Sequence, residues 1–395
     1  MKICFILGGK PAYSETFLIS KMNGLYKSGD DIYFSAGSKT IKTLKGKQLK
    51  GFTKGSGLAA YKILFVALCM NLIKPGNAIK FFKLERASGK SLKDSLKSFL
   101  LNAHLLPHKF DWIHFTFGTL ILGNENLAKA TGAKCSLSFR GFDIVNYPLK
   151  HPGCYERAWQ VLDKVHVISD DIWNLAKANG LPDYVSVEKI FPAINTTIFA
   201  QTQNLIPQVN SIASTGRLLW KKGYRYAIEA IALLKAEGYN LKLHIAGSGD
   251  EYERLAFQAH QLNVAENIVF EGKIDHEDMP DFLQKHTIYI QPSLQEGFCN
   301  SVIEAQAAGL FCIVSDAGGL PENVLHEQTG FVVLRRNAEA LAAAIKRAIL
   351  LSPEERNVYK ENALRHVEKN FNIDNQIQQF RKFYETMSGA VKYER

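Results

Sequence analysis

The sequence predicts an α/β protein with two domains, each built on a doubly wound parallel sheet. Its 395 residues are too many for one ordinary hydrophobic core. Short apolar runs alternate with amphipathic stretches from end to end, the pattern of repeated strand–helix units around parallel sheets. A polar stretch at 192–210 shows no strong periodicity and separates two such arrays. Because open α/β sheets bind ligands at the carboxyl ends of their strands, a ligand cleft between the two sheets is expected.

Each element follows from its apolar pattern. In the first array, strands are expected at 2–7, 31–35, 112–115, 134–139, 164–168 and 187–191. Helices separate them, such as 14–28 and 154–162. In the second array, strands are expected at 211–214, 242–246, 268–271, 287–290, 311–315 and 330–333. The helices between them include 224–237, 251–262, 276–286 and 337–349.

Composition is that of a soluble globular protein, with 46% hydrophobic and 22% charged residues. The six cysteines show no C-x-x-C spacing, which favours reduced cytosolic thiols over disulfides or a zinc site. The apolar run after Met1 is too short for a signal peptide and is interpreted as the first strand. These features predict a cytoplasmic protein.

The net charge of +10 is concentrated in residues 39–109, which hold 15 Lys and Arg against two acidic residues. On a helical wheel, lysines gather on one side: Lys80, Lys83, Lys90, Lys93 and Lys97. Apolar residues share the other: Phe81, Leu84, Leu92, Leu96 and Phe99, with Gly89 as a helix breaker. Two interpretations stay open, an anionic membrane surface or a solvated face over domain core. No nucleic-acid motif accompanies the lysines. The apolar run 58–73 falls short of the ~20 residues of a spanning helix.

The segment 296–304, Glu-Gly-Phe-Cys-Asn-Ser-Val-Ile-Glu, places two carboxylates eight positions apart. A buried strand that ends at Pro292 precedes it, and strong helix formers follow. Strand, glycine turn and helix together present backbone N–H groups and the positive end of a helix dipole, which bind phosphate. Glu296 lies before the helix and Glu304 about two turns along it. Taken alone, the spacing favours a solvated loop Glu and a surface helix Glu, because Glu pairs are common.

Two similar turns support a binding site. Ser315-Asp-Ala-Gly-Gly-Leu-Pro-Glu322 is a strand followed by a glycine pair, Gly318 and Gly319. Ser214-Thr-Gly-Arg-Leu-Leu-Trp-Lys-Lys-Gly223 offers Arg217 and Lys222 after another strand. Three turns of this kind in one strand–helix array predict a specific phosphate site.

The order of these turns along the chain and the residues that form them resemble the family 4 glycosyltransferases, which are retaining enzymes of the GT-B fold. The matching pieces are Gly216-Arg-Leu with Lys222-Gly223, Ile245-Ala-Gly-Ser-Gly249, Gly272-Lys-Ile, Gln291-Pro-Ser, Glu296-Gly-Phe, Glu304-Ala-Gln-Ala-Ala-Gly309 and Gly318-Gly-Leu-Pro-Glu322. They cover 211–333 densely. The first half matches loosely, at Ser14-Glu-Thr-Phe, Arg140-Gly-Phe-Asp143 and His166-Val-Ile-Ser169.

The resemblance implies two Rossmann-like domains that face a cleft. Residues 1–193 would be the acceptor-side domain and 194–372 the donor domain, and the C-terminal helix in 373–395 would pack back on the first. The implied activity moves a sugar from a nucleotide-diphosphate sugar to an acceptor hydroxyl with retention. The acceptor would be a lipid-linked saccharide of exopolysaccharide or lipopolysaccharide assembly, at the cytoplasmic face of the inner membrane.

The resemblance also implies roles at the donor side. Arg217 and Lys222 would neutralise the diphosphate and stabilise it as a leaving group. Glu304 would accept hydrogen bonds from the ribose hydroxyls, and Glu296 would meet the transferred sugar. Backbone N–H groups for the phosphates would come from Phe298, Cys299 and Asn300. Close backbone approach would come from Gly216, Gly247, Gly249, Gly318 and Gly319. No D-x-D motif stands at a strand end, so neither a metal nor another cofactor is expected. The acidic runs 275–278 and 170–171 are interpreted as helix N-caps.

On the acceptor side the candidates are Gly9, His114, Arg140 and Asp143. Arg140 stands where the family often has His, and Thr116 where it often has a second one. Arg140 is therefore expected either to bind a phosphate or acidic sugar or to pair with Asp143. His114 is compatible with a catalytic role but more typical of a hydrogen-bonded strand histidine. Alternative functions are a GT-B nucleotide-sugar epimerase, a phosphorolytic enzyme, or a non-enzymatic nucleotide-sugar-binding subunit.

Overall fold

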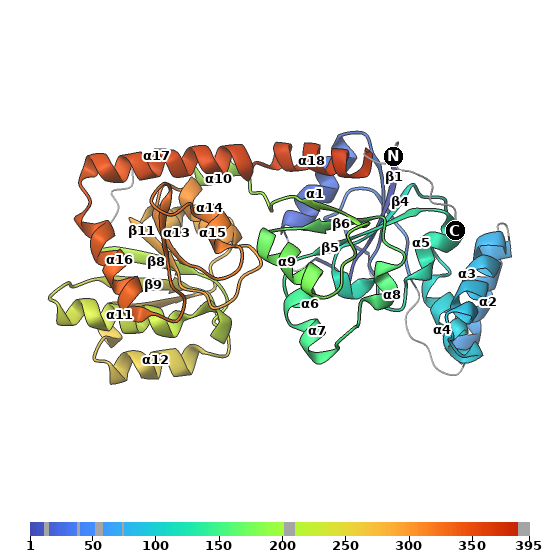
Figure 1. The fold of residues 1–395 in the computed structure, drawn as a ribbon, viewed down its shortest axis with the longest axis horizontal. Coiled ribbons are helices and arrows are strands. Elements are labelled where there is room, and N and C mark those ends of the chain that lie inside the picture. Colours follow the sequence, from blue (N-terminus) through green and yellow to red (C-terminus); the bar gives the residue numbers. More distant parts are fainter. Residues whose placement is uncertain (12–15, 38–39, 52–57, 73–74, 201–209, 386–395) are drawn as a thin grey trace. The chain divides into compact units, whose positions relative to one another are not determined.

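The computed structural model describes residues 1–11, 16–37, 40–51, 58–72, 75–200 and 210–385 (Figure 1). Several predictions from sequence lie outside these residues: Ser14 and Glu15 of the Ser14-Glu-Thr-Phe segment, 201–209 of the linker, and 386–395 of the C-terminal segment. The chain forms two compact units. The first contains Met1–Ile190 and the segment that begins at Gln376, and the second contains Phe191–Asn375.

The first unit is built on a seven-stranded parallel sheet with the order β3-β2-β1-β4-β5-β6-β7. Its strands are β1 (Lys2–Ile6), β2 (Asp31–Ser35), β3 (Lys47–Gln48), β4 (Trp112–Phe115), β5 (Lys134–Phe139), β6 (Lys164–Val167) and β7 (Ser186–Lys189). Its helices are α1 (Thr16–Lys27), α2 (Leu58–Leu72), α3 (Pro75–Ala87), α4 (Leu92–Asn102), α5 (Asn126–Thr131), α6 (Phe142–Val145), α7 (Tyr147–Lys150), α8 (Glu156–Trp159) and α9 (Asp170–Ala178). The two-residue strand β3 was not predicted, and α8 is shorter than expected.

The C-terminal helix α18 (Ile373–Glu385) contributes to the core of the first unit. Its residues Phe380, Phe383 and Tyr384 are buried with Phe5 and Trp112. The Trp112 indole N–H donates to the Tyr384 carbonyl at 2.9 Å, across 272 positions of sequence. The first unit is therefore discontinuous in the chain.

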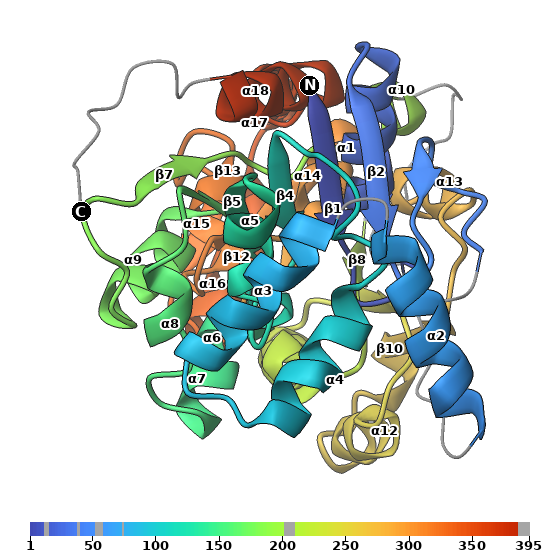
Figure 2. The same cartoon turned by 90° about the vertical axis from the view of Figure 1, so that its right-hand side faces the viewer.

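The basic segment folds into α2, α3 and α4, which lie side by side (Figure 2). Gly89, with φ of +81°, separates α3 from α4 as expected. Two details of the helical-wheel prediction are wrong. Lys90 is not a solvated lysine, because its ammonium contacts the buried Glu85 carboxylate at 2.5 Å. Leu92 and Leu96 do not join the core with Phe81 and Phe99, because both side chains are exposed, which contradicts the interpretation of this side of the helix as domain core.

The second unit is built on a six-stranded parallel sheet with the order β10-β9-β8-β11-β12-β13. Its strands are β8 (Ser211–Thr215), β9 (Lys242–Ala246), β10 (Ile268–Gly272), β11 (Ile288–Gln291), β12 (Phe311–Ser315) and β13 (Gly330–Val333). Its helices are α10 (Thr196–Phe199), α11 (Tyr224–Ala236), α12 (Tyr252–Gln261), α13 (Met279–Gln284), α14 (Asn300–Ala307), α15 (Leu320–Asn323), α16 (Ala338–Leu350) and α17 (Pro353–Asn370). Two cores sandwich the sheet.

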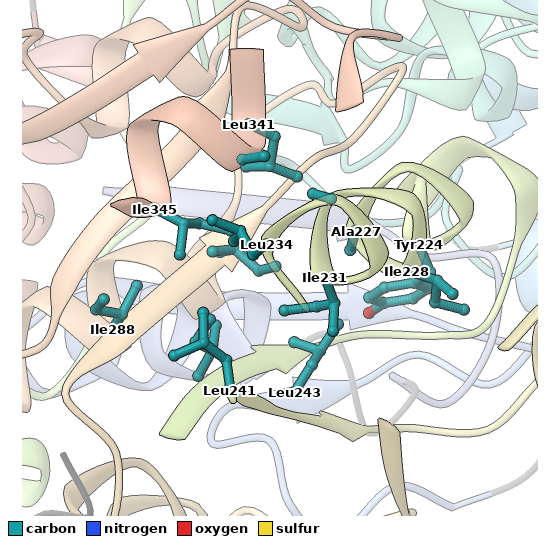
Figure 3. Packing of buried hydrophobic residues seen from close by; sticks show 14 of the residues in the cluster. Tyr224, Ala227, Ile228, Ile231, Leu234, Leu241, Leu243, Ile288, Leu341 and Ile345 are labelled. Atoms are coloured by element: carbon teal, nitrogen blue, oxygen red, sulfur yellow. The ribbon is translucent and has the colours of Figure 1, made fainter. Parts of the chain in front are cut away.

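Helix α11 illustrates how sequence spacing produces one of these cores. Its buried residues Tyr224, Ala227, Ile228, Ile231 and Leu234 recur at helical spacing and form one face. Figure 3 shows this face against strand residues such as Leu243 and Ile288 and against Leu341 and Ile345 of α16. At roughly 1.5–3 kcal/mol for each large apolar side chain, this packing fixes the position of the turns that follow β8 and β9.

Two helix starts differ from the sequence prediction. The cap of α9 is Ser169, whose hydroxyl accepts the Ile172 N–H, while Asp170 and Asp171 lie in the first turn. Helix α13 begins at Met279, three residues later than expected, because Pro280 occupies its first turn. Asp278 precedes it without a side-chain capping bond. The acidic run 275–278 therefore supplies the N-cap residue of α13, as predicted, whereas the run 170–171 lies just inside α9.

Candidate active site

The predicted donor-side residues follow neighbouring strands of the second sheet. Gly216, Arg217 and Lys222 follow β8, and Gly247 and Gly249 follow β9. The segment 296–300 follows β11, and Gly318 and Gly319 follow β12. These four strands are adjacent in the order β9-β8-β11-β12, so their carboxyl ends meet at one edge of the sheet. The structure thus gathers the three turns that the sequence singled out.

Lys222 and Glu296 form an ion pair at this edge. Only 14% of the Lys222 side chain and 9% of the Glu296 side chain are exposed. Burial acts to lower the pKa of the Lys222 ammonium, but the Glu296 charge and hydrogen bond outweigh it, so the pKa is raised. Lys222 therefore keeps its positive charge. At the neighbouring Lys221 burial lowers the pKa, and the Glu296 charge, which acts in the opposite direction, does not outweigh it.

A buried chain of hydrogen bonds, which the sequence did not reveal, supports Glu296. The Tyr289 hydroxyl donates to Gln291 Oε1 at 3.0 Å, and the Gln291 amide donates to Ser293 Oγ at 2.8 Å. The Ser293 hydroxyl then donates to Glu296 Oε1 at 3.1 Å. All three supporting side chains are fully buried. These hydrogen bonds and the ion pair with Lys222 together fix the position of the Glu296 carboxylate.

Glu304 lies on α14, and its partner is a histidine that sequence reasoning passed over. Because α14 begins at Asn300, Glu304 lies little more than one turn along it, and not two as predicted. His276 Nε2, from the loop between β10 and α13, is 3.7 Å from Glu304 Oε1. The Glu304 carboxylate raises the pKa of His276 above its usual value, against the effect of partial burial. The only sequence signal was the position of His276 after a strand of the same edge.

The N-terminus of α14 carries part of the predicted phosphate site. Asn300 is its first residue and Cys299 its N-cap. The Cys299 N–H already donates to Asn323 Oδ1 at 3.2 Å, so the prediction that it faces a phosphate does not fit this structure. The Phe298 ring packs on Phe191 and Phe371, which fixes the turn before the helix. Phe298 and Asn300 remain the candidates for backbone donors.

The glycines bring the turns close to one another. A Cβ on Gly247, where φ is +155°, would lie 1.9 Å from the Gly216 carbonyl oxygen. A Cβ on Gly249 would lie 2.4 Å from the Leu218 carbonyl oxygen. The Gly319 N–H donates to the Glu296 carbonyl at 3.1 Å, joining the turns after β12 and β11. The missing side chains of Gly247 and Gly249 therefore allow neighbouring turns of the protein to pack against each other, rather than only allowing a ligand to approach.

The acceptor-side candidates lie in the first unit at the ends of β1, β4 and β5, which are adjacent. The buried Asp143 accepts the N–H groups of Gly118, Arg140 and Gly141, so its carboxylate fixes the local backbone. The Arg140 guanidinium lies 3.9 Å over the Phe17 ring and donates through Nε to the Thr116 carbonyl. Gly9 follows β1, and a Cβ there would meet open space.

His114 lies in a buried polar cluster rather than at the strand ends. Its Nδ1 is 2.9 Å from Ser136 Oγ, and its Nε2 is 2.9 Å from Ser138 Oγ and 3.3 Å from Lys21 Nζ. Burial and the charge on Lys21 lower the pKa of His114 well below its usual value. The structure therefore corrects its inclusion among acceptor-side candidates: it is a hydrogen-bonded core histidine.

Within the described ranges, no group of three or more His, Cys, Asp or Glu side chains forms a metal site. Among the same residues, none of the helices combines the length and the apolar character needed to cross a membrane.

Comparison with known proteins identifies part of the chain. Residues 197–366 match the family model described as glycosyl transferases group 1. An uncharacterized glycosyltransferase of Methanocaldococcus jannaschii is 34% identical over 42% of this chain and 42% of its own length. Protein CapJ of Staphylococcus aureus is 33% identical over 39% of this chain and 38% of its own length. The matches to these two relatives thus span about two fifths of their length. The amylovoran biosynthesis glycosyltransferase AmsK of Erwinia amylovora is 25% identical over 88% of this chain and 90% of its own length.

Solved structures resemble the fold along nearly the whole chain. Sucrose-phosphate synthase from Thermosynechococcus elongatus has a TM-score of 0.71 at 18% identity, covering 97% of this chain and 98% of its own. HepE of Anabaena in complex with UDP has a TM-score of 0.71 at 15% identity, and the match covers 98% of this chain and 100% of the HepE chain. The predicted GT-B fold is confirmed, and residues 197–366 match a glycosyltransferase family model, while membership of family 4 stays a prediction. The chain therefore carries a glycosyl transferases group 1 domain, at residues 197–366, within a GT-B fold.

Proposed function

We propose that this protein transfers a sugar from a nucleotide-diphosphate sugar to an acceptor hydroxyl, with retention of configuration and without a metal ion. The observation that carries the proposal is the Lys222–Glu296 ion pair, set among phosphate-competent turns at one sheet edge of the group 1 domain. The names of two relatives, an amylovoran and a capsular polysaccharide biosynthesis glycosyltransferase, favour polysaccharide assembly. HepE was solved with UDP-glucose, which supports a nucleotide-sugar donor.

The donor half of the reaction needs a stabilised leaving group. Arg217 has an exposed side chain and Lys222 a permanent charge, so both are suited to neutralise a diphosphate as its charge grows. On donor binding, Lys222 would share its charge between Glu296 and the diphosphate. Glu296 would then face the reacting sugar, where positive charge develops, and Glu304 would hold the ribose. The turns of Gly216, Gly318 and Gly319, with the Phe298 and Asn300 N–H groups, would surround the phosphates.

The acceptor half is assigned to the strand ends of the first unit. Arg140 replaces the frequent histidine of the family, and its guanidinium is fixed by the Phe17 ring and the Thr116 carbonyl. A fixed guanidinium suits a phosphate, which it can bind with two parallel hydrogen bonds. A lipid-linked saccharide carries such a phosphate at the start of its glycan. Gly9 would allow the acceptor close to the backbone.

The test is product analysis with labelled donors. Purified protein is screened for binding of UDP-, GDP-, ADP- and dTDP-sugars, and the donor that binds is incubated with a lipid extract that contains lipid-linked saccharides. Transfer of label to lipid, with the anomeric configuration of the donor retained by NMR, is the expected result. Release of a free epimer or of a sugar phosphate would instead identify an epimerase or a phosphorolytic enzyme. Tight donor binding without any turnover would favour a binding subunit.

A surface of the first unit favours a membrane-bound acceptor. Among the side chains of α2 that the structure describes, from Phe65 onward, Ala67 and Asn71 are buried, whereas the large apolar ones are exposed: Phe65, Val66, Leu68, Met70 and Leu72. Phe65 and Leu72 are 69% and 73% exposed. The buried Asn71 amide donates to the carbonyls of Ala67 and Ala103, which fixes this orientation. Exposed lysines on the neighbouring α3 and α4 are Lys80, Lys83, Lys93 and Lys97. We propose that this surface, the α2–α4 surface, binds anionic lipid on the cytoplasmic face of the inner membrane.

Sedimentation with vesicles tests the α2–α4 surface. Native protein should bind vesicles of phosphatidylcholine with phosphatidylglycerol and should bind less as salt rises, because exposed charges are screened within ~10 Å at 0.1 M. Replacing Lys80, Lys83, Lys93 and Lys97 by Gln should lower binding by more than tenfold at about 1 kcal/mol per lysine. The control exchanges Lys27 and Lys150, exposed elsewhere on the first unit, for Gln. Equal binding by all three proteins would refute the proposal.

A further inference from the structure

The contact between His276 and Glu304 joins a titratable loop residue to the carboxylate proposed for the ribose. His276 lies in the loop after β10, and Glu304 lies on α14. Their Nε2 and Oε1 atoms are 3.7 Å apart, which is an ion-pair distance but longer than a hydrogen bond. The Phe199 ring of α10 packs edge-on against the imidazole at 5.7 Å and limits where it can move. The contact is therefore held by the fold on two sides.

The groups around His276 make its charge depend on Glu304. The Glu304 carboxylate raises the pKa of His276, and Glu277 beside it acts in the same direction while partial burial opposes them. Asp275, in the same loop, pairs with Lys273 at 3.4 Å. From α10 the uncharged Phe199 ring packs against the imidazole. Glu304 is thus the main partner that stabilises the protonated imidazole.

A ribose and a protonated histidine compete for the same carboxylate. A carboxylate that binds two neighbouring hydroxyls uses both of its oxygens as acceptors. In this structure one of them, Glu304 Oε1, faces His276. We propose that protonated His276 draws the Glu304 carboxylate away from the ribose, so that the donor binds when His276 gives up its proton. His276 is then a positioning residue that makes donor affinity depend on pH, and the inference rests on the proposed role of Glu304.

The sign of the dependence follows from linkage. Without donor, Glu304 stabilises the protonated form of His276 and keeps its pKa raised. With the ribose on Glu304, that stabilisation falls and the pKa decreases, so donor binding releases a proton. Affinity is accordingly highest above the pKa of His276 in the free protein. It falls as the pH decreases through that value, by up to tenfold for each pH unit.

Calorimetric titration of the nucleoside diphosphate that binds, taken from UDP, GDP, ADP and dTDP, tests the proposal between pH 5.5 and 8. The ratio of the Kd of native protein to the Kd of His276→Gln isolates His276, because protonation of the nucleotide's own phosphate is common to both. The ratio should rise several-fold toward low pH. Native protein should also release more protons on binding than the variant, measured in buffers of different ionisation enthalpy. His326→Gln is the matched control, since His326 lies 3.6 Å from Glu327 on the surface of the same unit.

The outcomes separate this inference from the function on which it rests. If no nucleoside diphosphate binds at any pH, the proposed donor site fails. If one binds but the ratio stays constant with pH, His276 has no such role and the inference is overturned. His276→Gln should melt at the same temperature as native protein. Should it unfold, His276→Asn takes its place. Glu304→Gln gives an independent measurement, since removing the carboxylate should also abolish the proton release that native protein shows in excess of His276→Gln.

Discussion

Removing the Lys222 ammonium is expected to destabilise the second unit before any substrate is present. In Lys222→Met the Glu296 carboxylate would keep the Ser293 hydroxyl but lose its cation. Breaking a buried ion pair costs about 3–5 kcal/mol. Because 14% and 9% of the two side chains reach solvent, we expect the lower end, about 3 kcal/mol. With a urea dependence of ~3 kcal/mol per molar, the unfolding midpoint should fall by roughly 1 M.

A double-mutant cycle separates the pair from its surroundings. Glu296→Gln keeps an oxygen for Ser293 but removes the negative charge, so the double variant should lose less than the sum of the single losses. A coupling free energy of about 2 kcal/mol is expected for side chains in direct contact. Lys221→Met is the matched control: burial lowers the pKa of Lys221, so the site does not stabilise its charge. That variant should change stability by less than about 1 kcal/mol.

Urea unfolding followed by circular dichroism gives all four free energies. A coupling free energy below about 0.5 kcal/mol, or equal losses for Lys222→Met and Lys221→Met, would mean that the ion pair contributes nothing in the free protein. The proposal that Glu296 is fixed before the donor arrives would then be wrong.

Four further outcomes follow from the site. Glu304→Gln should raise the donor KM by roughly 10- to 150-fold with kcat little altered, because the ribose does not change during transfer and charge-assisted hydrogen bonds contribute ~1.5–3 kcal/mol. Glu296→Gln should instead lower kcat by more than it weakens binding of the bare nucleoside diphosphate; an intact kcat would reverse the assignment of the two carboxylates. Ser293→Ala should lower kcat by about tenfold through a misplaced Glu296, since one hydrogen bond to a charged carboxylate contributes ~1.5 kcal/mol, and unchanged turnover would show that Lys222 alone suffices. Turnover should persist in excess EDTA, and a loss restored by Mg²⁺ or Mn²⁺ would contradict metal independence.

The strands were largely predictable because each is a short apolar run between turn residues. The expected limits of β2, β4, β5, β9, β12 and β13 agree with the structure. A strand buried on both faces needs no information beyond its own sequence. The two-residue strand β3 was not predicted, because so short a segment shows no apolar pattern of its own and is defined by its pairing with β2.

What could not be predicted depends on partners distant in sequence. A helical wheel divides α4 into two faces, but it cannot say which neighbour covers each face, so whether Leu92 and Leu96 join the core or stay exposed was left open. The sequence placed Lys222 and Glu296 in one site with separate ligand partners. Their contact with each other, 74 positions apart, depends on side-chain geometry in the absence of donor. The approach of His276 to Glu304 likewise leaves no periodic signal.

The discontinuity of the first unit has a consequence for the order in which the chain can fold during synthesis. Its core needs Phe380, Phe383 and Tyr384, and the Lys164 ammonium donates to the Phe383 carbonyl at 2.9 Å. These residues leave the ribosome only after all of Phe191–Asn375 has emerged. The second unit can therefore complete its core before α18 is available to the first. A nascent chain stalled before α18 would leave Trp112 without the acceptor of its indole N–H, so the unit whose strands are synthesised first completes its core later.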